Sequence, residues 1–134
     1  MTPTYPLLGL LWNGEQHGYE LKRIIADEFA PFWRIDFAQL YRSLAKMTSE
    51  GWVKSRVESG EGAPDRKVYT ITARGRRAFE DWVAQPARDR NEFFVKLRLA
   101  TDAQLPVAHL LESQRIQFEN EREMRQHTHK VLRD

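Results

Sequence analysis

The hydrophobic pattern of the chain changes period twice in its central segment. Behind Asp36, whose carboxylate suits a helix N-cap, apolar residues recur at helical spacing, at Phe37, Leu40, Leu44 and Met47. Gly51 follows in a position typical of a left-handed residue that ends a helix. Residues 52–57 and 68–72 then have extended character and flank the Gly/Pro turn SGEGAPDRK. The pattern predicts a helix followed at once by a β-hairpin, which is the outline of a winged helix.

A second face of the predicted helix is polar and basic. Its members lie at i, i+3, i+4 and i+7, so they share one side, and they are Gln39, Arg42, Ser43 and Lys46. Arg42 can bind a guanine edge with two hydrogen bonds, Gln39 can pair with adenine, and Ser43 can contact a base or a phosphate. Lys46 can neutralise a phosphate. An ordinary solvated face is the alternative, and the sequence does not decide which residue reads bases.

Three further side chains are candidates for the same surface. Arg66 and Lys67 lie on the downstream edge of the hairpin turn, where they are either ordinary loop charges or contacts to phosphate or the minor groove. Tyr41 is either an aromatic residue at the edge of the core or a hydroxyl that reaches a phosphate. The segment FWRI (residues 32–35) is short and aromatic, and we expect it to add a small strand beside the hairpin.

Three segments together span roughly residues 5 to 84: LLGLLWNGEQHGYELKRI, FWRIDFAQLYRSLAKMTSEGWV and RKVYTITARGRRAFEDWV. Their motifs, in this order, resemble the N-terminal domain of the PadR-like transcriptional regulators. The resemblance implies a dimeric winged helix-turn-helix repressor that small ligands or stress release from an inverted-repeat operator in double-stranded DNA. We therefore expect a mostly α fold with a small β-hairpin wing, followed by C-terminal dimerisation helices.

Pro86 and the charged stretch after it mark the expected domain boundary. Residues 1–86 are predicted to form the DNA-binding domain, and residues 87–134 a linker and a helical dimerisation region. The apolar residues of this second part have no obvious cover within the chain, so we expect a homodimer held by Phe93, Leu97, Leu110, Leu111, Phe118 and Met124. A small aromatic effector is expected near the junction, against Trp82, Phe93, Phe94 and Leu97.

Charge and composition narrow the possible functions. Residues 36–78 hold nine Lys/Arg and five Asp/Glu, a net charge of +4, whereas the rest of the chain has a net charge of −2. Cationic charge is thus concentrated on the proposed DNA-binding half. The chain has no cysteine, no apolar run of membrane-spanning length and no leader-like start, so we expect a cytoplasmic protein.

No motif for catalysis, a cofactor or a metal is visible. The chain has no nucleophile elbow, Walker loop or Rossmann glycine pattern, and His127 and His129 diverge on a helix and cannot chelate one ion. We therefore expect no enzyme activity, no cofactor and no metal. The sequence favours a sequence-specific DNA-binding repressor; the alternative is a winged-helix module for protein–protein contact without DNA binding.

Overall fold

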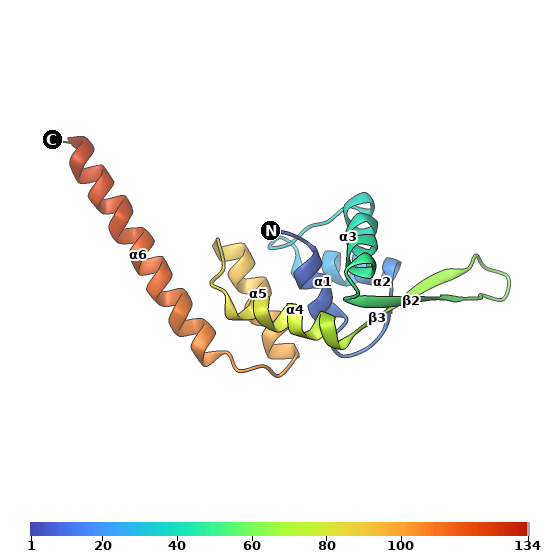
Figure 1. The fold of residues 1–134 in the computed structure, drawn as a ribbon. Helices are drawn as coiled ribbons and strands as arrows, with labels where there is room; N and C mark the ends of the chain where they lie inside the picture. The colour runs from blue at the N-terminus through green and yellow to red at the C-terminus, as the bar shows by residue number, and fades with distance from the viewer. Residues whose placement is uncertain (134) are drawn as a thin grey trace.

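A small sheet and the helices around it form the body of the molecule, from which a hairpin and one long helix project (Figure 1). The structure is a computed structural model, and it describes residues 1–133. In chain order the elements are α1 (Thr4–Leu10), β1 (Gln16–His17), α2 (Gly18–Ile24), the π-helical turn η1 (Ile25–Phe29), α3 (Phe37–Ser49), β2 (Val53–Glu58), β3 (Arg66–Ile71), α4 (Ala73–Ala84), α5 (Arg90–Asp102) and α6 (Ala108–Arg133).

Helix α3 begins and ends as the sequence predicts. The Asp36 carboxylate accepts a hydrogen bond from the Gln39 backbone N–H at 2.7 Å, and Gly51 has a φ of 75° after the last turn. Leu40, Leu44 and Met47 are fully buried. Phe37 was expected on the same stripe, but that prediction is wrong: its side chain is 45% exposed, because the first residue of the helix lies at the surface beside Tyr19 of α2.

The sheet is antiparallel with the strand order β1–β3–β2. The hairpin pairs Val53 with Ile71 at its base and Glu58 with Arg66 near its tip, which agrees with the predicted strands. The third strand is Gln16–His17 and not residues 32–35 as expected. The aromatic segment is placed differently because its apolar side chains are needed inside: Trp33 is 4% exposed and Ile35 is 6% exposed within the core.

Helix α5 belongs to the same core as the winged helix. Val95, Leu99 and Ala100 of α5 are buried together with Leu7 of α1 and Phe79 of α4. Gly9 allows this close approach, since a Cβ at that position would lie 2.9 Å from the Phe79 ring and 3.1 Å from the Leu99 Cβ. The residues before and after Pro86 therefore share one hydrophobic core.

A buried lysine joins α4 to α5. Lys96 has no exposed surface; its ammonium donates to the Gln85 carbonyl at 2.6 Å and lies 4.5 Å from the centre of the Trp82 ring. Burial lowers the pKa of Lys96 to about 8, and the carboxylate of Glu92, 3.8 Å away, opposes that change. The lysine thus satisfies the carbonyl of the residue that caps α4 and lies over an aromatic ring.

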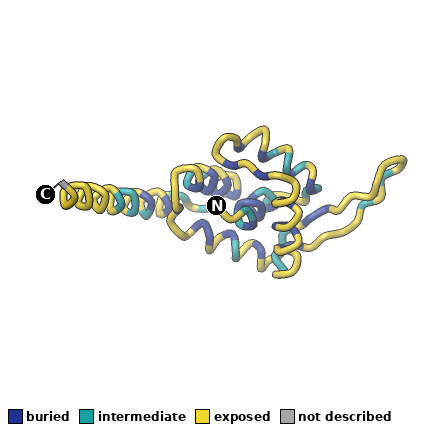
Figure 2. The backbone as a smooth tube through the Cα atoms, turned by 90° about the horizontal axis from the view of Figure 1, so that it is seen from above, coloured by how far each residue is buried: buried dark blue, intermediate teal, exposed yellow. Residues whose placement is uncertain are grey.

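Helix α6 is fixed at its start and exposed along the rest of its length (Figure 2). The buried Gln114 amide accepts from the Ala87 N–H at 2.6 Å and donates to the Ala87 carbonyl at 3.2 Å. Leu110 is only 4% exposed because it packs into the core, so its predicted place at a dimer surface is wrong. In the part of the chain that the structure describes, no helix combines the length and apolar character needed to span a membrane.

Candidate nucleic-acid interface

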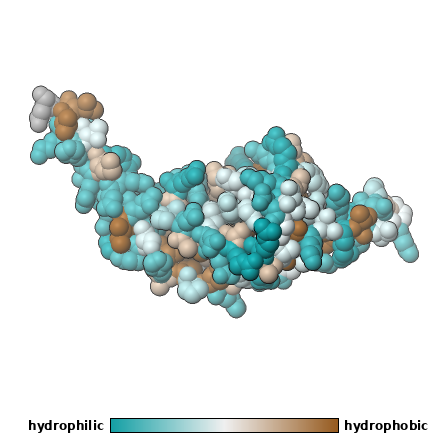
Figure 3. All heavy atoms as spheres, viewed as in Figure 1, coloured by the Kyte–Doolittle hydropathy of each residue, from teal (hydrophilic) through white to brown (hydrophobic). Residues whose placement is uncertain are grey.

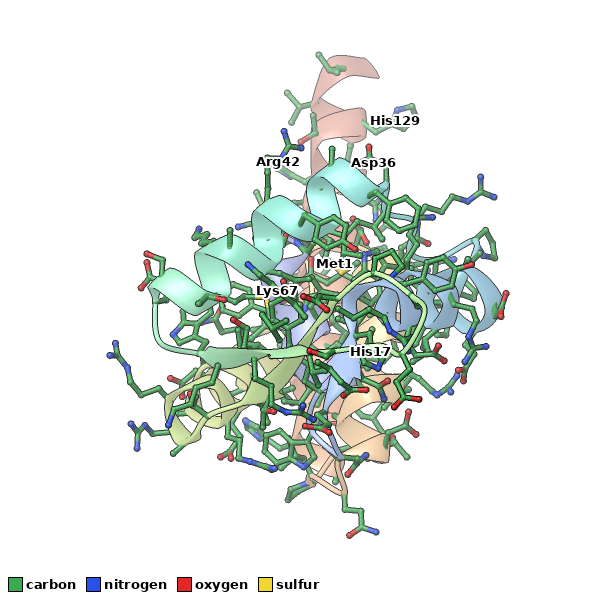
Figure 4. All side chains as sticks on the ribbon, turned by 90° about the vertical axis from the view of Figure 1, so that its right-hand side faces the viewer. Met1, His17, Asp36, Arg42, Lys67 and His129 are labelled. Carbon is green, nitrogen blue, oxygen red and sulfur yellow. The ribbon has the colours of Figure 1, made fainter. Side chains whose placement is uncertain are left out.

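The outer face of α3 and one edge of the hairpin form a continuous basic surface. Figure 4 shows Arg42 projecting from α3 on the side away from the sheet, with Lys67 on the hairpin below the helix. Arg42, Lys46, Arg66 and Lys67 are exposed, and none has an ion-pair partner among residues 1–133. These four cations therefore keep their charge available to an anionic partner.

Two residues predicted for this surface are placed differently. Ser43 is 8% exposed, because it borders the buried stripe of Leu40, Leu44 and Met47 on α3; the expectation that its hydroxyl faces DNA is wrong. The Gln39 side chain is exposed, but its amide oxygen accepts from the Asp36 backbone N–H at 3.2 Å. Gln39 completes a capping box, so its amide is engaged in starting the helix.

A groove of about 650 Å³ separates α3 from the hairpin. It brings three predicted residues together, because Tyr41 lines it from α3 while Arg66 and Lys67 line it from β3. Tyr41 is 49% exposed and Tyr69, also in the lining, is 6% exposed. Burial raises the pKa of Tyr69, so this phenol stays neutral in the groove. The hairpin wall of the groove carries two cations and the carboxylate of Asp65, and the opposite wall is helical.

Sequence reasoning missed several residues of this surface. Tyr19 of α2, Ala45 and Thr48 of α3 and Ser55 of β2 line the same groove. Tyr19 is 67% exposed, yet its helical spacing in α2 indicates an inner-face position. Only the tertiary packing of α2 against the start of α3 places its ring on this surface, where it stacks on Phe37.

The outer strand of the hairpin carries less available charge than its composition indicates. Arg56 pairs with Glu15 at 2.8 Å and with Glu58 at 3.4 Å. These contacts are solvent-exposed, so they contribute little to stability, but they occupy the guanidinium. On the groove side of the hairpin, the basic charge therefore lies on β3, at Arg66 and Lys67.

The expected effector residues do not form one site. Trp82 is 7% exposed, stacks on Tyr5 at 6.1 Å and lies against the Lys96 ammonium. It lines a depression of about 430 Å³ between α1 and α4, and Phe93, Phe94 and Leu97 are not among the lining residues of that depression. The Phe93 ring instead packs edge to face against the Phe118 ring of α6, with 6.2 Å between the ring centroids. The prediction of an open stacking surface that joins all four is wrong, because the indole is covered by its own chain.

A metal centre has no support within residues 1–133, where no three His, Cys, Asp or Glu side chains gather in an arrangement able to hold an ion. The Nδ1 atom of His17, which lines the groove, is buried and has no hydrogen-bond partner in the described part of the chain. One histidine cannot make a metal site alone.

Known proteins are similar to this chain in sequence and in fold. The negative transcriptional regulator PadR of Bacillus subtilis is 32% identical over 96 residues, which cover 69% of this chain and 53% of that protein. The chain spans about half the length of the curated relatives it matches. The crystal structure of Bacillus subtilis PadR in complex with operator DNA has a TM-score of 0.61 and 26% identity, over 98% of this chain and 78% of the other.

A second solved structure and a family-wide match agree with this relationship. The PadR-like transcriptional regulator BC1756 from Bacillus cereus has a TM-score of 0.57 and 29% identity, over 75% of this chain and 59% of the other. The sequence pattern of the transcriptional regulator PadR-like family matches residues 7–81, which hold the helix-turn-helix, the hairpin and most of α4. This chain belongs to the PadR-like family of transcriptional regulators.

Proposed function

We propose that the chain binds double-stranded DNA sequence-specifically as a homodimer and represses transcription in the cytoplasm. The observation that carries the proposal is the unpaired basic surface, in which Arg42 and Lys46 of α3 stand beside Arg66 and Lys67 of the hairpin. In this arrangement α3 enters the major groove, Arg42 binds a guanine edge, and the hairpin cations neutralise phosphates. The similar structure of Bacillus subtilis PadR was solved in complex with operator DNA, which supports DNA binding.

Replacing Arg42 by Ala should weaken binding to a specific site by about 1–3 kcal/mol and relax the base preference at one position. Arg42 is exposed, and its side chain has no hydrogen-bond or ion-pair partner among residues 1–133, so its loss should leave the unfolding curve unchanged. The site is first recovered by selecting bound sequences from a random DNA pool. Affinity is then measured by a gel-shift titration on the recovered site and on mutated sites.

The hairpin supplies the matched control for this measurement. The double variant Arg66→Ala and Lys67→Ala should lower affinity for all sequences alike and flatten the salt dependence, because phosphate contacts release counterions without reading bases. Equal affinity of the Arg42 variant and the wild type would refute the assignment of the α3 face. If the pool yields no enriched sequence, a protein–protein interaction module becomes the better account of the fold.

The far part of α6 supports the homodimer. Met124 is 72% exposed, Val131 is 58% exposed and Leu132 is 81% exposed, while Phe118 is half-buried. With 3.6 residues per turn, Phe118, Met124, Val131 and Leu132 lie toward one side of the helix. Figure 3 shows apolar patches along this projecting helix. A helix that extends from the body with apolar side chains uncovered is marginal alone and gains stability by packing on a second copy.

Placing charge on this side should produce monomers. The double variant Met124→Glu and Val131→Glu should have the mass of one chain in light scattering, where the wild type should have the mass of two, because two carboxylates cannot be desolvated in an apolar contact. The matched control is Gln126→Glu with Lys130→Glu, which adds the same carboxylates on the opposite side of the exposed helix and should stay dimeric. A dimeric Met124/Val131 variant would move the interface away from α6.

A small aromatic effector stays a prediction. Its expected neighbour Trp82 is covered. Phe94 of α5, however, is 47% exposed, and its ring centroid lies 5.2 Å from that of Phe32. A ligand there would release DNA only by binding the DNA-incompetent spacing of the two α3 helices more tightly than the competent one.

A further inference from the structure

The first turn of α3 presents apolar groups outward. Phe37, the first residue of the helix, is 45% exposed, and Ala38 beside it is also exposed. The polar residue of this turn is Gln39, whose amide oxygen is held by the Asp36 backbone N–H. Apart from the Gln39 amide nitrogen, the side chains that α3 presents first along the chain are therefore suited to apolar contact.

The Phe37 ring is held in place by its neighbours. Its ring centroid lies 6.3 Å from that of Tyr19 of α2, with 20° between the ring planes, and 6.2 Å from that of Tyr41 of α3, with 16° between the planes. The Lys22 ammonium lies 5.4 Å from the centre of the same ring. Because the side chain is already ordered, a partner that covers it does not pay for fixing its rotamer. An exposed, ordered aromatic row on a charged surface favours a bound state in which something apolar meets it.

The chemistry of DNA limits what this ring can recognise. In a helix-turn-helix, the N-terminal residues of the recognition helix contact base edges in the major groove. Among the base edges there, the C5-methyl of thymine is the apolar group, and phenylalanine is among the side chains that contact it. Phe37 has no donor or acceptor, so it distinguishes bases through that methyl. We propose that Phe37 is a specificity-determining residue that contacts the methyl group of a thymine in each half-site. This inference rests on the proposed DNA-binding function.

The spacing along α3 makes the proposal more specific. Phe37 and Arg42 are five residues apart, which is about 7.5 Å along a helix axis. Base pairs are stacked about 3.4 Å apart, so a rise of this size spans at most about two base pairs. The half-site should contain a thymine within about two base pairs of the guanine that Arg42 binds.

The test removes the methyl group from the DNA and the ring from the protein. In the site recovered from the random pool, each thymidine is replaced in turn by deoxyuridine, and affinity is measured for the wild-type chain and for Phe37→Ala. Wild type should lose about fourfold in affinity per half-site at one thymine, which corresponds to one methyl buried in an apolar contact. Phe37→Ala should bind thymidine and deoxyuridine at that position equally.

Two further variants keep the test decisive. Phe37→Leu retains an apolar side chain and should retain the methyl dependence, so it separates loss of contact from loss of folding. Phe32→Ala removes a ring that is equally exposed, at 44%, but lies against α5, and it should leave the dependence unchanged. Wild type that binds both DNAs alike, or Phe37→Ala that keeps the fourfold loss, overturns the proposal while DNA binding stands. A pool without enrichment overturns DNA binding itself and this inference with it.

Discussion

Replacing Leu99 by Ala should lower the free energy of unfolding by about 2–5 kcal/mol. Leu99 is 1% exposed and belongs to the same core as Leu7 and Phe79, with its Cβ beside the backbone of Gly9. The substitution removes methyl groups and leaves a cavity among elements that cannot collapse onto it. The measurement is denaturant unfolding followed by tryptophan fluorescence, at one fixed protein concentration because dimerisation adds to apparent stability.

The matched control is Leu132→Ala in α6. Leu132 is 81% exposed, so the same chemical change should alter the unfolding free energy by about 0.5 kcal/mol or less. The pair of variants tests whether α5 is part of the winged-helix core, as its burial indicates. Similar small effects for both would mean that α5 folds as a separate unit behind Pro86, as the sequence suggested.

Replacing Gly75 by Ala should destabilise the protein by about 2–4 kcal/mol. A Cβ at Gly75 would overlap the carbonyl oxygen of Trp52 and lie 2.9 Å from the Ile71 Cγ1. Neither neighbour can move easily. The Trp52 carbonyl accepts from the Thr72 N–H at 3.0 Å, and the Thr72 hydroxyl both accepts from the Gly75 N–H and donates to the Gly51 carbonyl. The added methyl must therefore push the start of α4 away from the turn that follows α3.

Gly14 provides the control for this substitution. A Cβ there would meet no atom within 4 Å, and the residue does not have a positive φ. Gly14→Ala should therefore be neutral or slightly stabilising, since it reduces the freedom of the unfolded chain. Thermal unfolding of the two variants beside the wild type gives the comparison. If Gly75→Ala were as stable as Gly14→Ala, the contact of α4 with the Trp52 carbonyl would not exist in solution.

Local chemistry alone determined much of the fold. Asp36 and Gln39 reciprocally cap α3, Gly51 ends it, and Thr72 caps α4, because each of these signals acts within four residues of the backbone that it satisfies. The hairpin followed from its turn residues. The family resemblance followed from the order of these local signals, and the match over residues 7–81 confirms it.

Tertiary packing decided what local patterns leave open. Ser43 satisfied a polar spacing rule but is buried, and Phe37 satisfied an apolar one but is exposed, because the width of the buried stripe depends on which helices cover α3. Leu110 and Trp82 looked available, yet each is covered by a segment distant in sequence. The sequence by itself determined where elements begin and end and which half carries the basic charge. Only the tertiary structure decided which side chains of each element reach the surface, since burial depends on partners that the local sequence does not specify.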